Sequence, residues 1–263
     1  MSSKKRIVLT FVPVRLPSSP IAIDFTGLLL QLLEVVWQYR RDSKEPKMSA
    51  AGYTPALGHA GLTPAYDLMI RLVTRERRWR ALLLRQLAPK PGETILDVGC
   101  GTGTFAILAK QATPGARIVG LDPDPEVLKR AKDKAERAGV DIEWRIGLAS
   151  DAARYAGEFD KAVSSLVFHQ VPVTEKSAGL AAMMTAVRTG GEIHIADYCR
   201  QPDWLMRQLF RSIQLLDGPV NTGANADGAI EELLAIHAGR PVAPRALVKT
   251  PTGAISLFRL KKR

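Results

Sequence analysis

The strongest constraint on the fold is an alternation of strand-like and helix-like segments from residue 93 to residue 198. Short apolar runs rich in Val, Ile and Leu are mostly separated by helical patterns that end near Gly or Pro. Because a parallel pair of strands needs a crossover, this order predicts a parallel sheet covered by helices on both faces. The expected strands are 93–99, 116–122, 141–147, 159–168 and 190–198, and the expected helices are 104–112, 124–139 and 174–188.

The C-terminal segment has a different pattern. Residues 246–250 and 254–260 are β-rich runs that flank a Pro-Thr-Gly turn, which is typical of a hairpin. With 263 residues, the chain is long enough for one α/β domain and an extension. The expected fold class is therefore α/β: a doubly wound, mostly parallel seven-stranded sheet with a C-terminal antiparallel hairpin.

The first 90 residues differ in composition from the sheet-forming part. Residues 1–47 are basic and turn-rich, and their apolar run is shorter than the about 20 residues of a membrane-spanning helix. We expect them to be a poorly ordered extension that folding does not need, since Met48 offers a second start. The segment 20–41 has an amphipathic pattern that would allow peripheral membrane contact. Residues 48–90 are expected to form a helical lid, and 91–263 the main domain.

The turn after the first expected strand carries the clearest functional signal. The strand ends in Asp97, and Gly99, Gly101 and Gly103 follow on alternate positions. Glycines permit positive φ and close approach of a ligand, and the next helix presents free N–H groups there. The spacing differs from the G-x-G-x-x-G of a dinucleotide site, and a carboxylate is unfavourable beside a pyrophosphate. The turn favours a cationic ligand, such as the sulfonium and ammonium groups of S-adenosylmethionine.

The segments ILDVGCGTG and VGLDPDPEVL together resemble the first two motifs of class I S-adenosylmethionine-dependent methyltransferases. The resemblance extends from about residue 53 to the C-terminus, and is closest to bacterial small-molecule methyltransferases related to quinone-biosynthesis C-methyltransferases. It implies a Rossmann-like fold, methyl transfer by in-line displacement, and an acid at position 122 that accepts hydrogen bonds from the ribose hydroxyls. The cofactor-binding residues that it implies are Asp97, Gly99, Cys100, Gly101, Gly103, Asp122, Pro123, Leu148, Ala149 and Ser165.

The chain departs from the family after the third expected strand. Where the family often has an acid that meets the adenine amino group, this chain has Leu148. Leu148 and Ala149 are left to offer an apolar wall and a backbone N–H, and Asp151 is either a substitute acid or a solvated loop residue. Further along, Ser165 is expected to pass the cofactor, and Asp197 is expected to face the methyl acceptor.

Methyl transfer requires an aligned acceptor and, for some acceptors, a general base. His169, just beyond the fourth expected strand, is the first candidate base, and His59, in the expected lid, is the second. Both also have a structural interpretation, as loop histidines bonded to backbone or water. His194 alternates with isoleucines inside a strand and is expected to be structural. We expect no metal ion, because the sequence contains no spacing typical of metal ligands.

The net charge of +11 keeps a nucleic-acid acceptor among the alternatives. The segment after the fourth strand reads SSLVF, however, where enzymes that methylate base amines have an Asn/Asp-Pro-Pro-aromatic tetrad. Three interpretations remain: a small-molecule methyltransferase, an RNA or protein methyltransferase, and a cofactor-binding regulatory protein without catalysis. Two distant cysteines, Cys100 and Cys199, favour a reducing, cytoplasmic setting.

No motif identifies the methyl acceptor. Residues 199–218 follow the fifth expected strand with a helical pattern, in which Trp204, Leu205, Met206 and Phe210 are candidates for an apolar pocket. Ordinary helix packing is the alternative. The neighbouring Arg200 and Arg207 would suit an aromatic, lipid-like or anionic small molecule. The acceptor atom and the oligomeric state are left open.

Overall fold

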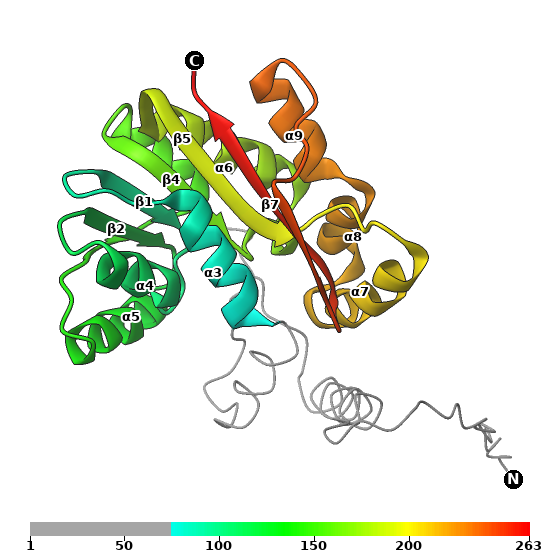
Figure 1. Cartoon of the computed structure of the whole chain (residues 1–263). Coiled ribbons are helices and arrows are strands. Elements are labelled where there is room, and N and C mark those ends of the chain that lie inside the picture. The colour runs from blue at the N-terminus through cyan, green and yellow to red at the C-terminus, as the bar shows by residue number, and fades with distance from the viewer. Residues whose placement is uncertain (1–74) are drawn as a thin grey trace, which may run out of the picture. The chain divides into compact units, whose positions relative to one another are not determined.

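The computed structural model describes residues 75–263, which are drawn as the coloured ribbon in Figure 1. The expected extension 1–47, with its segment 20–41, lies outside the described residues, as do His59 and most of the expected lid. Among residues 75–263, no helix is long and apolar enough to cross a bilayer.

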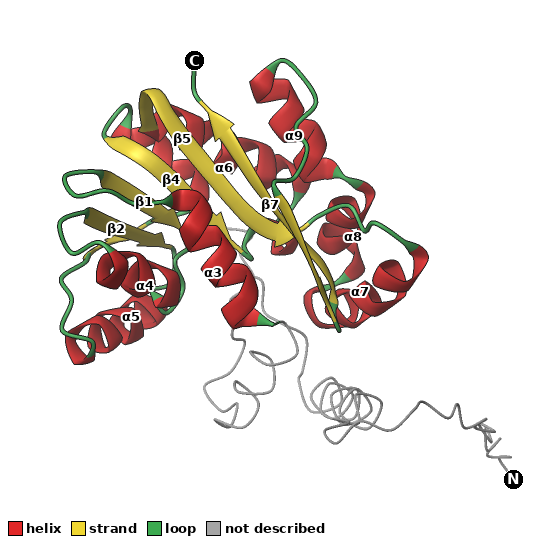
Figure 2. Cartoon of the chain, in the orientation of Figure 1, coloured by secondary structure: helices red, strands yellow, loops and turns green. Residues whose placement is uncertain are grey.

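Helices and strands alternate through most of the described chain, as Figure 2 shows by colour. The strands are β1 (Thr94–Val98), β2 (Arg117–Asp122), β3 (Glu143–Ile146), β4 (Phe159–Ser165), β5 (Val187–Tyr198), β6 (Ala246–Thr250) and β7 (Gly253–Lys261). The α-helices are α3 (Glu76–Leu87), α4 (Thr104–Ala112), α5 (Pro125–Arg137), α6 (Val173–Ala186), α7 (Trp204–Asp217), α8 (Pro219–Asp227) and α9 (Ala229–Ala238). The 3₁₀ helices are η1 (Ala149–Tyr155) and η2 (Phe168–Gln170).

The strands form one seven-stranded sheet in the order β3-β2-β1-β4-β5-β7-β6. The strands β1 to β5 are parallel, while β7 is antiparallel to both β5 and β6. This arrangement confirms the predicted mostly parallel sheet and its C-terminal hairpin. The strand order reverses between β1 and β4, so the carboxyl ends of these two strands flank the crevice where such sheets bind ligands.

Helices cover both faces of the sheet, and each face has its own apolar core (Figure 1). On one face, α3, α4 and α7 bury their apolar side chains against the sheet, and on the other face α6 and α9 do so. Strands β1 and β2 are buried and apolar over most of their length, as expected for parallel strands covered on both sides, whereas the edge strand β3 has no buried residue. The first core includes Trp79, Leu83, Phe105, Ile118, Val163 and Phe210, and the second includes Leu96, Val119, Phe159, Leu180, Met183 and Leu234.

Local sequence explains where two of the helices begin. The side chain of Asp124 accepts hydrogen bonds from the N–H groups of Glu126 and Val127, and a proline occupies the first helical position of α5. In the same way, Asp203 caps α7 by accepting from the N–H of Met206 at 2.9 Å. Helix α5 therefore starts directly behind β2, and its N-terminus lies at the carboxyl edge of the sheet.

The structure differs from the predicted boundaries in three places. Strand β4 ends at Ser165 rather than at 168, because Leu166 has a φ of 56° and residues 168–170 turn into η2. Strand β5 begins at Val187 rather than at 190, since Val187 pairs with Phe159 at the start of β4. Helices α8 and α9 have no counterpart in the prediction. The glycine, asparagines and threonine of α8 have low helix propensity, which tertiary packing overrides.

Candidate active site

Asp97 lies near the carboxyl end of β1 and is buried, with 1% of its surface exposed. Neither of its carboxylate oxygens has a partner at full hydrogen-bond geometry among the described residues. Burial raises the pKa of Asp97 from 3.8 to about 7; the charge of Arg80 acts in the opposite direction, and the backbone N–H of Ala106 lowers the pKa only as a minor influence. An unpaired buried carboxylate is costly, so this position is suited to a ligand that brings hydrogen-bond donors or positive charge.

The glycine turn beside Asp97 leaves open space on its inner side. Gly99, Gly101 and Gly103 have φ values of 67°, 52° and 70°, which other residues rarely adopt. A Cβ at Gly101 would meet no atom within 4 Å, whereas a Cβ at Gly99 would collide with the side chain of Val167. Gly99 is therefore required by packing against the loop after β4. Gly101 instead leaves room for a ligand next to the N-terminus of α4.

Asp122 lies at the end of β2, next to the glycine turn, and is buried. Its two oxygens accept hydrogen bonds from the N–H of Gly101 at 2.9 Å and from the N–H of Asp124 at 3.1 Å. Burial raises the pKa of Asp122, and these two bonds oppose that shift. The expected ribose acid is thus placed beside the turn, oriented by backbone donors. Between them, the buried thiol of Cys100 has a pKa well above its usual value because of its burial.

The expected adenine side of the site is partly occupied by contacts within the protein. The N–H of Leu148 donates to Oδ2 of Asp151 at 2.8 Å, and the other carboxylate oxygen pairs with Arg154 at 2.9 Å. Asp151 therefore caps η1, which fits the interpretation of a structural loop residue better than that of a substitute acid. Because the N–H of Leu148 already donates to Asp151, only the side chain of Leu148 is left for the predicted contact with the cofactor.

The end of β4 carries two features typical of ligand-binding edges. The hydroxyl of Ser164 is buried and has no partner among the described residues, while the neighbouring Ser165 is half-buried. Leu166 then adopts a left-handed backbone conformation, and its N–H donates to the carbonyl of Ala196 on β5 at 2.9 Å. Such a conformation costs a non-glycine residue on the order of 1–3 kcal/mol and persists only where its surroundings impose it.

Those surroundings are provided largely by Asp197. One oxygen of this buried carboxylate accepts from the N–H groups of Val167 and Phe168, at 3.1 and 2.7 Å. The other accepts from the N–H of Tyr198 at 2.8 Å and lies 2.6 Å from Nδ1 of His169. Asp197 was expected to face the acceptor, but both of its oxygens hold the loop after β4.

His169 lies buried in η2 between two carboxylates. Its Nε2 is 3.3 Å from Oδ2 of Asp217, the last residue of α7, while its Nδ1 contacts Asp197. Burial disfavours charge on the ring, but the two carboxylates outweigh burial and raise the pKa of His169 to about 9. The residue expected as a base is thus located at the carboxyl edge of the sheet, in an environment that favours its protonated form near neutral pH.

Other predicted residues lie away from this edge or in the core. His194 is fully buried between Gln86 and Glu192, which agrees with its expected structural role. Met206 and Phe210 are buried in helix packing rather than free to line a pocket, whereas Trp204 is 75% exposed and Leu205 is also exposed.

Three residues near the site were not singled out in the sequence. Arg80 on α3 pairs with Glu76 at 2.6 Å and acts on the charge of Asp97. Lys176 on α6 is buried, and burial lowers its pKa to about 8. Asp217 ends α7 and meets His169. Arg80 and Glu76 are four residues apart on a helix, so the sequence indicates only an ordinary ion pair along that helix. No local sequence pattern distinguishes Lys176 or Asp217.

Comparison with known proteins agrees with this geometry. Residues 95–191 match the family described as a methyltransferase domain. An uncharacterized methyltransferase of Synechocystis sp. is 33% identical over 144 residues, which are 53% of this chain and 65% of that protein. The demethylmenaquinone methyltransferase of Thermus thermophilus is 29% identical over 155 residues, 57% of this chain and 68% of that protein. The chain thus spans less than two thirds of the length of the Synechocystis relative.

A solved structure shows the same architecture over most of the chain. The magnesium protoporphyrin IX methyltransferase of Synechocystis, solved with bound SAH, superposes with a TM-score of 0.57 at 16% identity. The superposition covers 91% of this chain and 96% of that one. The glycine turn, the acids at the carboxyl ends of β1 and β2, and the sheet order agree with the sequence matches. Residues 95–191 match the methyltransferase domain family, as the resemblance to class I S-adenosylmethionine-dependent methyltransferases led us to expect.

Proposed function

We propose that this chain transfers the methyl group of S-adenosylmethionine to a small-molecule acceptor. The observation that carries the proposal is the buried carboxylate of Asp97, whose two oxygens lack partners beside the open space at Gly101. A cationic ligand would supply the missing donors and offset the cost of burying the ionised carboxylate. A dinucleotide would instead place a pyrophosphate next to Asp97, which charge repulsion opposes.

The residues at this edge fit the parts of the cofactor. Asp97 would hold its positively charged groups, Asp122 would accept from its ribose hydroxyls, and the charge of Arg80 would complement its carboxylate. The other expected positions, Gly99, Cys100, Gly103, Pro123, Ala149 and Ser165, belong to the strand ends and turns around them. When bound, the cofactor supplies a methyl group on a good leaving group, so the protein has to align the acceptor and exclude water.

The loop after β4 is the element that would align the acceptor. Asp197 holds its backbone at Val167 and Phe168, and Ser165 and Leu166 form its start. His169 remains a candidate general base for an acceptor that must lose a proton, and it would have to act from its neutral form. His59 remains the second candidate.

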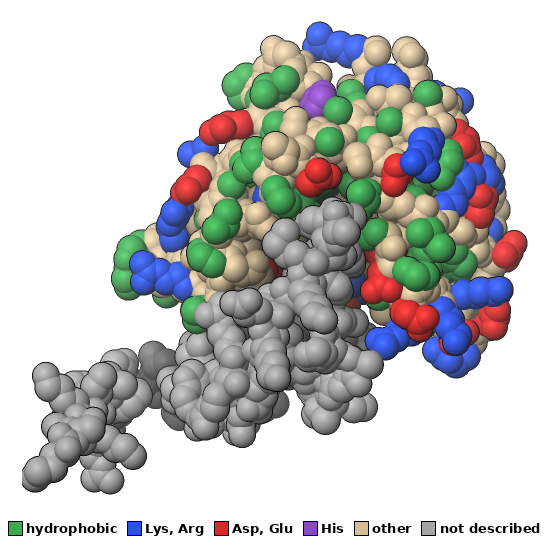
Figure 3. Space-filling view, turned by 180° about the vertical axis from the view of Figure 1, so that it is seen from behind, with side chains coloured by type: hydrophobic (Ala, Val, Ile, Leu, Met, Phe, Trp, Pro, Cys, Tyr) green, Lys and Arg blue, Asp and Glu red, His purple; other side chains and the backbone are tan. Residues whose placement is uncertain are grey.

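The acceptor class is proposed as small and partly apolar, aromatic, lipid-like or anionic. In support, two of the similar proteins are named as a demethylmenaquinone methyltransferase and a magnesium protoporphyrin IX methyltransferase, both after small molecules. Arg200 and Arg207 are already paired with Glu232 and Asp227, at 3.9 and 2.7 Å, so an anionic acceptor would have to compete for them. On the face in Figure 3, positive and negative side chains are interspersed, which favours a small acceptor over a nucleic acid.

We also propose a cytoplasmic location, with peripheral membrane contact through residues 20–41 for a lipid-like acceptor. The cysteines Cys100 and Cys199 are both free and buried, which is compatible with a reducing compartment.

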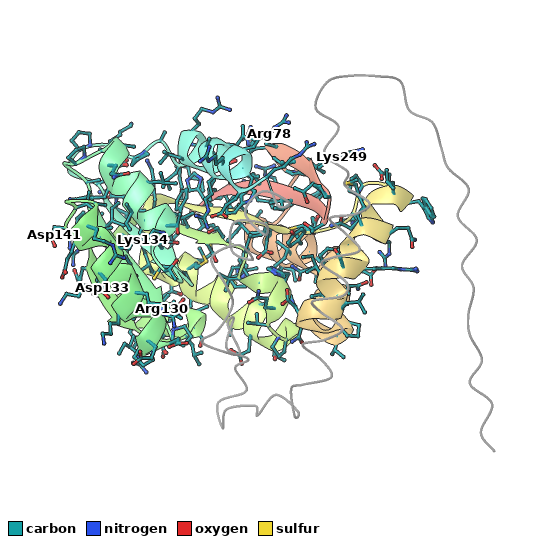
Figure 4. All side chains as sticks on the ribbon, turned by 90° about the horizontal axis from the view of Figure 1, so that it is seen from below. Arg78, Arg130, Asp133, Lys134, Asp141 and Lys249 are labelled. Carbon is teal, nitrogen blue, oxygen red and sulfur yellow. The ribbon has the colours of Figure 1, made fainter. Side chains whose placement is uncertain are left out.

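Calorimetric titration with S-adenosylmethionine tests the cofactor assignment. Asp97→Ala should weaken binding about 100-fold or more, the effect of removing a charged partner from a buried site. Asp141→Ala is the matched control, because Asp141 is an exposed acid at the outer end of the molecule in Figure 4. Equal affinity of the parent and Asp97→Ala would refute the site.

Product formation separates an enzyme from a regulatory binder. Cell extract is incubated with the protein and S-adenosylmethionine labelled in its methyl group, and mass spectrometry searches for molecules that gain the label. The same reaction with Asp97→Ala is the control. Label found only in RNA or in proteins would replace the small-molecule proposal with the nucleic-acid or protein alternative. Binding without any labelled product would support the regulatory alternative.

A further inference from the structure

His169 joins parts of the molecule that are far apart in sequence. Its ring lies between Asp197 on β5 and Asp217 at the end of α7, and we call these three side chains the His169 bridge. The ring is almost fully buried, and Tyr198 packs edge-on against it with ring centroids 5.2 Å apart. The position of the ring is therefore fixed by packing as well as by its two polar contacts.

The geometry of the bridge defines the protonation state that suits it. A carboxylate can only accept hydrogen bonds, and a neutral imidazole has a proton on one nitrogen only. Nδ1 lies 2.6 Å from one carboxylate and Nε2 lies 3.3 Å from the other, so both contacts are satisfied only when both nitrogens carry a proton. A base that must accept a proton from a methyl acceptor needs a free nitrogen lone pair instead.

We infer that His169 is a positioning residue, which as an imidazolium between Asp197 and Asp217 fastens the loop after β4 to helix α7. The inference rests on the proposed function, because it assigns the fastened loop to the methyl-transfer site. It is the alternative to the role of general base for this residue, and the test below separates the two roles. The bridge fixes the loop after β4 relative to helix α7. An acceptor would approach the loop between these two elements.

A second set of contacts ties the same loop to α8 and α6. The side-chain amide of Asn221 donates to the carbonyl of Gln170 at 2.9 Å. The ammonium of Lys176 donates to the carbonyl of Val171 and, at 3.0 Å, to the carbonyl of Asn221. The loop 166–171 is thus bound on one side by Asp197 and on the other by α7 and α8. Among these contacts of the described residues, only the one between His169 and Asp217 links the loop to α7 through charged groups. Loss of the His169 bridge would remove it.

The charged and titratable groups around the ring come from three elements. Asp197 and Tyr198 belong to β5, Asp217 to α7, and Lys176 to α6, where its charge acts on Asp197. Burial raises the pKa of Tyr198 above its usual value, so this phenol stays neutral. Opposite charges on both sides outweigh burial and keep the proton on His169 up to pH about 9.

The test is a pH titration of the full chain labelled with ¹⁵N in its histidine rings, followed by NMR. The chain has four histidines, and His169→Gln identifies the signal of His169 by its loss. We expect its two ring nitrogens to report a doubly protonated ring at pH 7.5. Asp217→Asn, which keeps the shape but removes the charge, should weaken proton binding at His169 about tenfold. Asp227→Asn, which removes the Arg207 partner on the adjacent helix, should leave it unchanged.

Hydrogen exchange tests positioning in the same variants. Asp217→Asn should raise amide exchange about tenfold in both 166–172 and the end of α7, whereas Asp227→Asn should leave 166–172 unchanged. A neutral His169 ring at pH 7.5, or an Asp217→Asn variant that titrates and exchanges like the parent, overturns the inference. Neither measurement needs cofactor or acceptor, so a failure of the parent to bind S-adenosylmethionine in calorimetry would contradict the proposed function separately.

Discussion

The indole ring of Trp144 on β3 lies directly against Gly120 on β2, so closely that a Cβ at Gly120 would come within 2.5 Å of two ring carbons. The same ring would meet a Cβ at Gly103, in the turn that opens α4. One tryptophan therefore requires glycine both in the neighbouring strand and in the glycine turn after β1. The packing of β3 is coupled in this way to the shape of the candidate site.

Gly120→Ala should lower the free energy of unfolding by about 1–3 kcal/mol, because the bulky ring and the sulfur of Cys100 must both move. Gly223→Ala is the matched control, since a Cβ there meets only one side-chain atom, at 3.9 Å, and α8 should gain helix propensity. Urea unfolding of both variants measures the difference. A Gly120→Ala variant as stable as the parent would contradict this packing.

Asp97→Asn should stabilise the protein without cofactor at alkaline pH while impairing cofactor binding. The pKa of Asp97 is about 7 in the folded chain against 3.8 as its ordinary value, so the folded state retains a proton that the unfolded state releases. The stability contributed by the neutral carboxyl is present below 3.8 and is lost as the pH rises to about 7. The gain from asparagine should therefore grow over that range to about 2–4 kcal/mol.

Urea unfolding at pH 4 and pH 8 measures this gain, with Asp141→Asn as the exposed control. A destabilised Asp97→Asn variant at pH 8 would mean that the carboxylate is paired within the free protein after all.

Gly101→Ala should impair cofactor binding more than stability. At a φ of 52°, a Cβ costs about 1–2 kcal/mol and points into open space that the proposed ligand would fill. Gly139→Ala, at a φ of 66° with no atom near its Cβ, imposes a comparable backbone cost at the far end of α5. We expect similar urea midpoints for the two variants, but at least about tenfold weaker S-adenosylmethionine binding for Gly101→Ala only. Equal affinities would show that the space at Gly101 is not used.

His169→Gln should destabilise the protein in a pH-dependent way. With a folded pKa of about 9 against 6.5 as the ordinary value, the His169 bridge contributes its full stability below pH 6.5 and loses it as the pH rises through 9. The difference between parent and variant should be up to about 3 kcal/mol at pH 6 and should shrink at pH 10. Unfolding curves over this range measure it, and a difference that widens with pH would have the wrong sign.

The sheet and the positions of the glycine turn and its neighbouring acids could be predicted because they depend on local patterns. Alternating apolar runs identified all seven strands, and Asp97, Gly101 and Asp122 stand at fixed distances from strand ends. What could not be predicted depends on contacts across the fold. The positive φ of Leu166 results from the contacts of the loop with Asp197, which is 31 residues further along the chain. The second carboxylate partner of His169, Asp217, comes from α7. Helix α8 forms through packing that its own propensities oppose.

The strand order has a kinetic consequence for the site. Asp97 is in register with Val163 on β4, and Ser165 is in register with Ala196 on β5, so neighbours at the carboxyl edge are separated by one or more complete crossovers. Closing such long loops is entropically costly and slow, and it has to be completed before these side chains come together. A fragment that stops before β5 lacks Asp197 and cannot shape the loop after β4. During refolding, cofactor binding should therefore appear late, after most of the helical signal has returned.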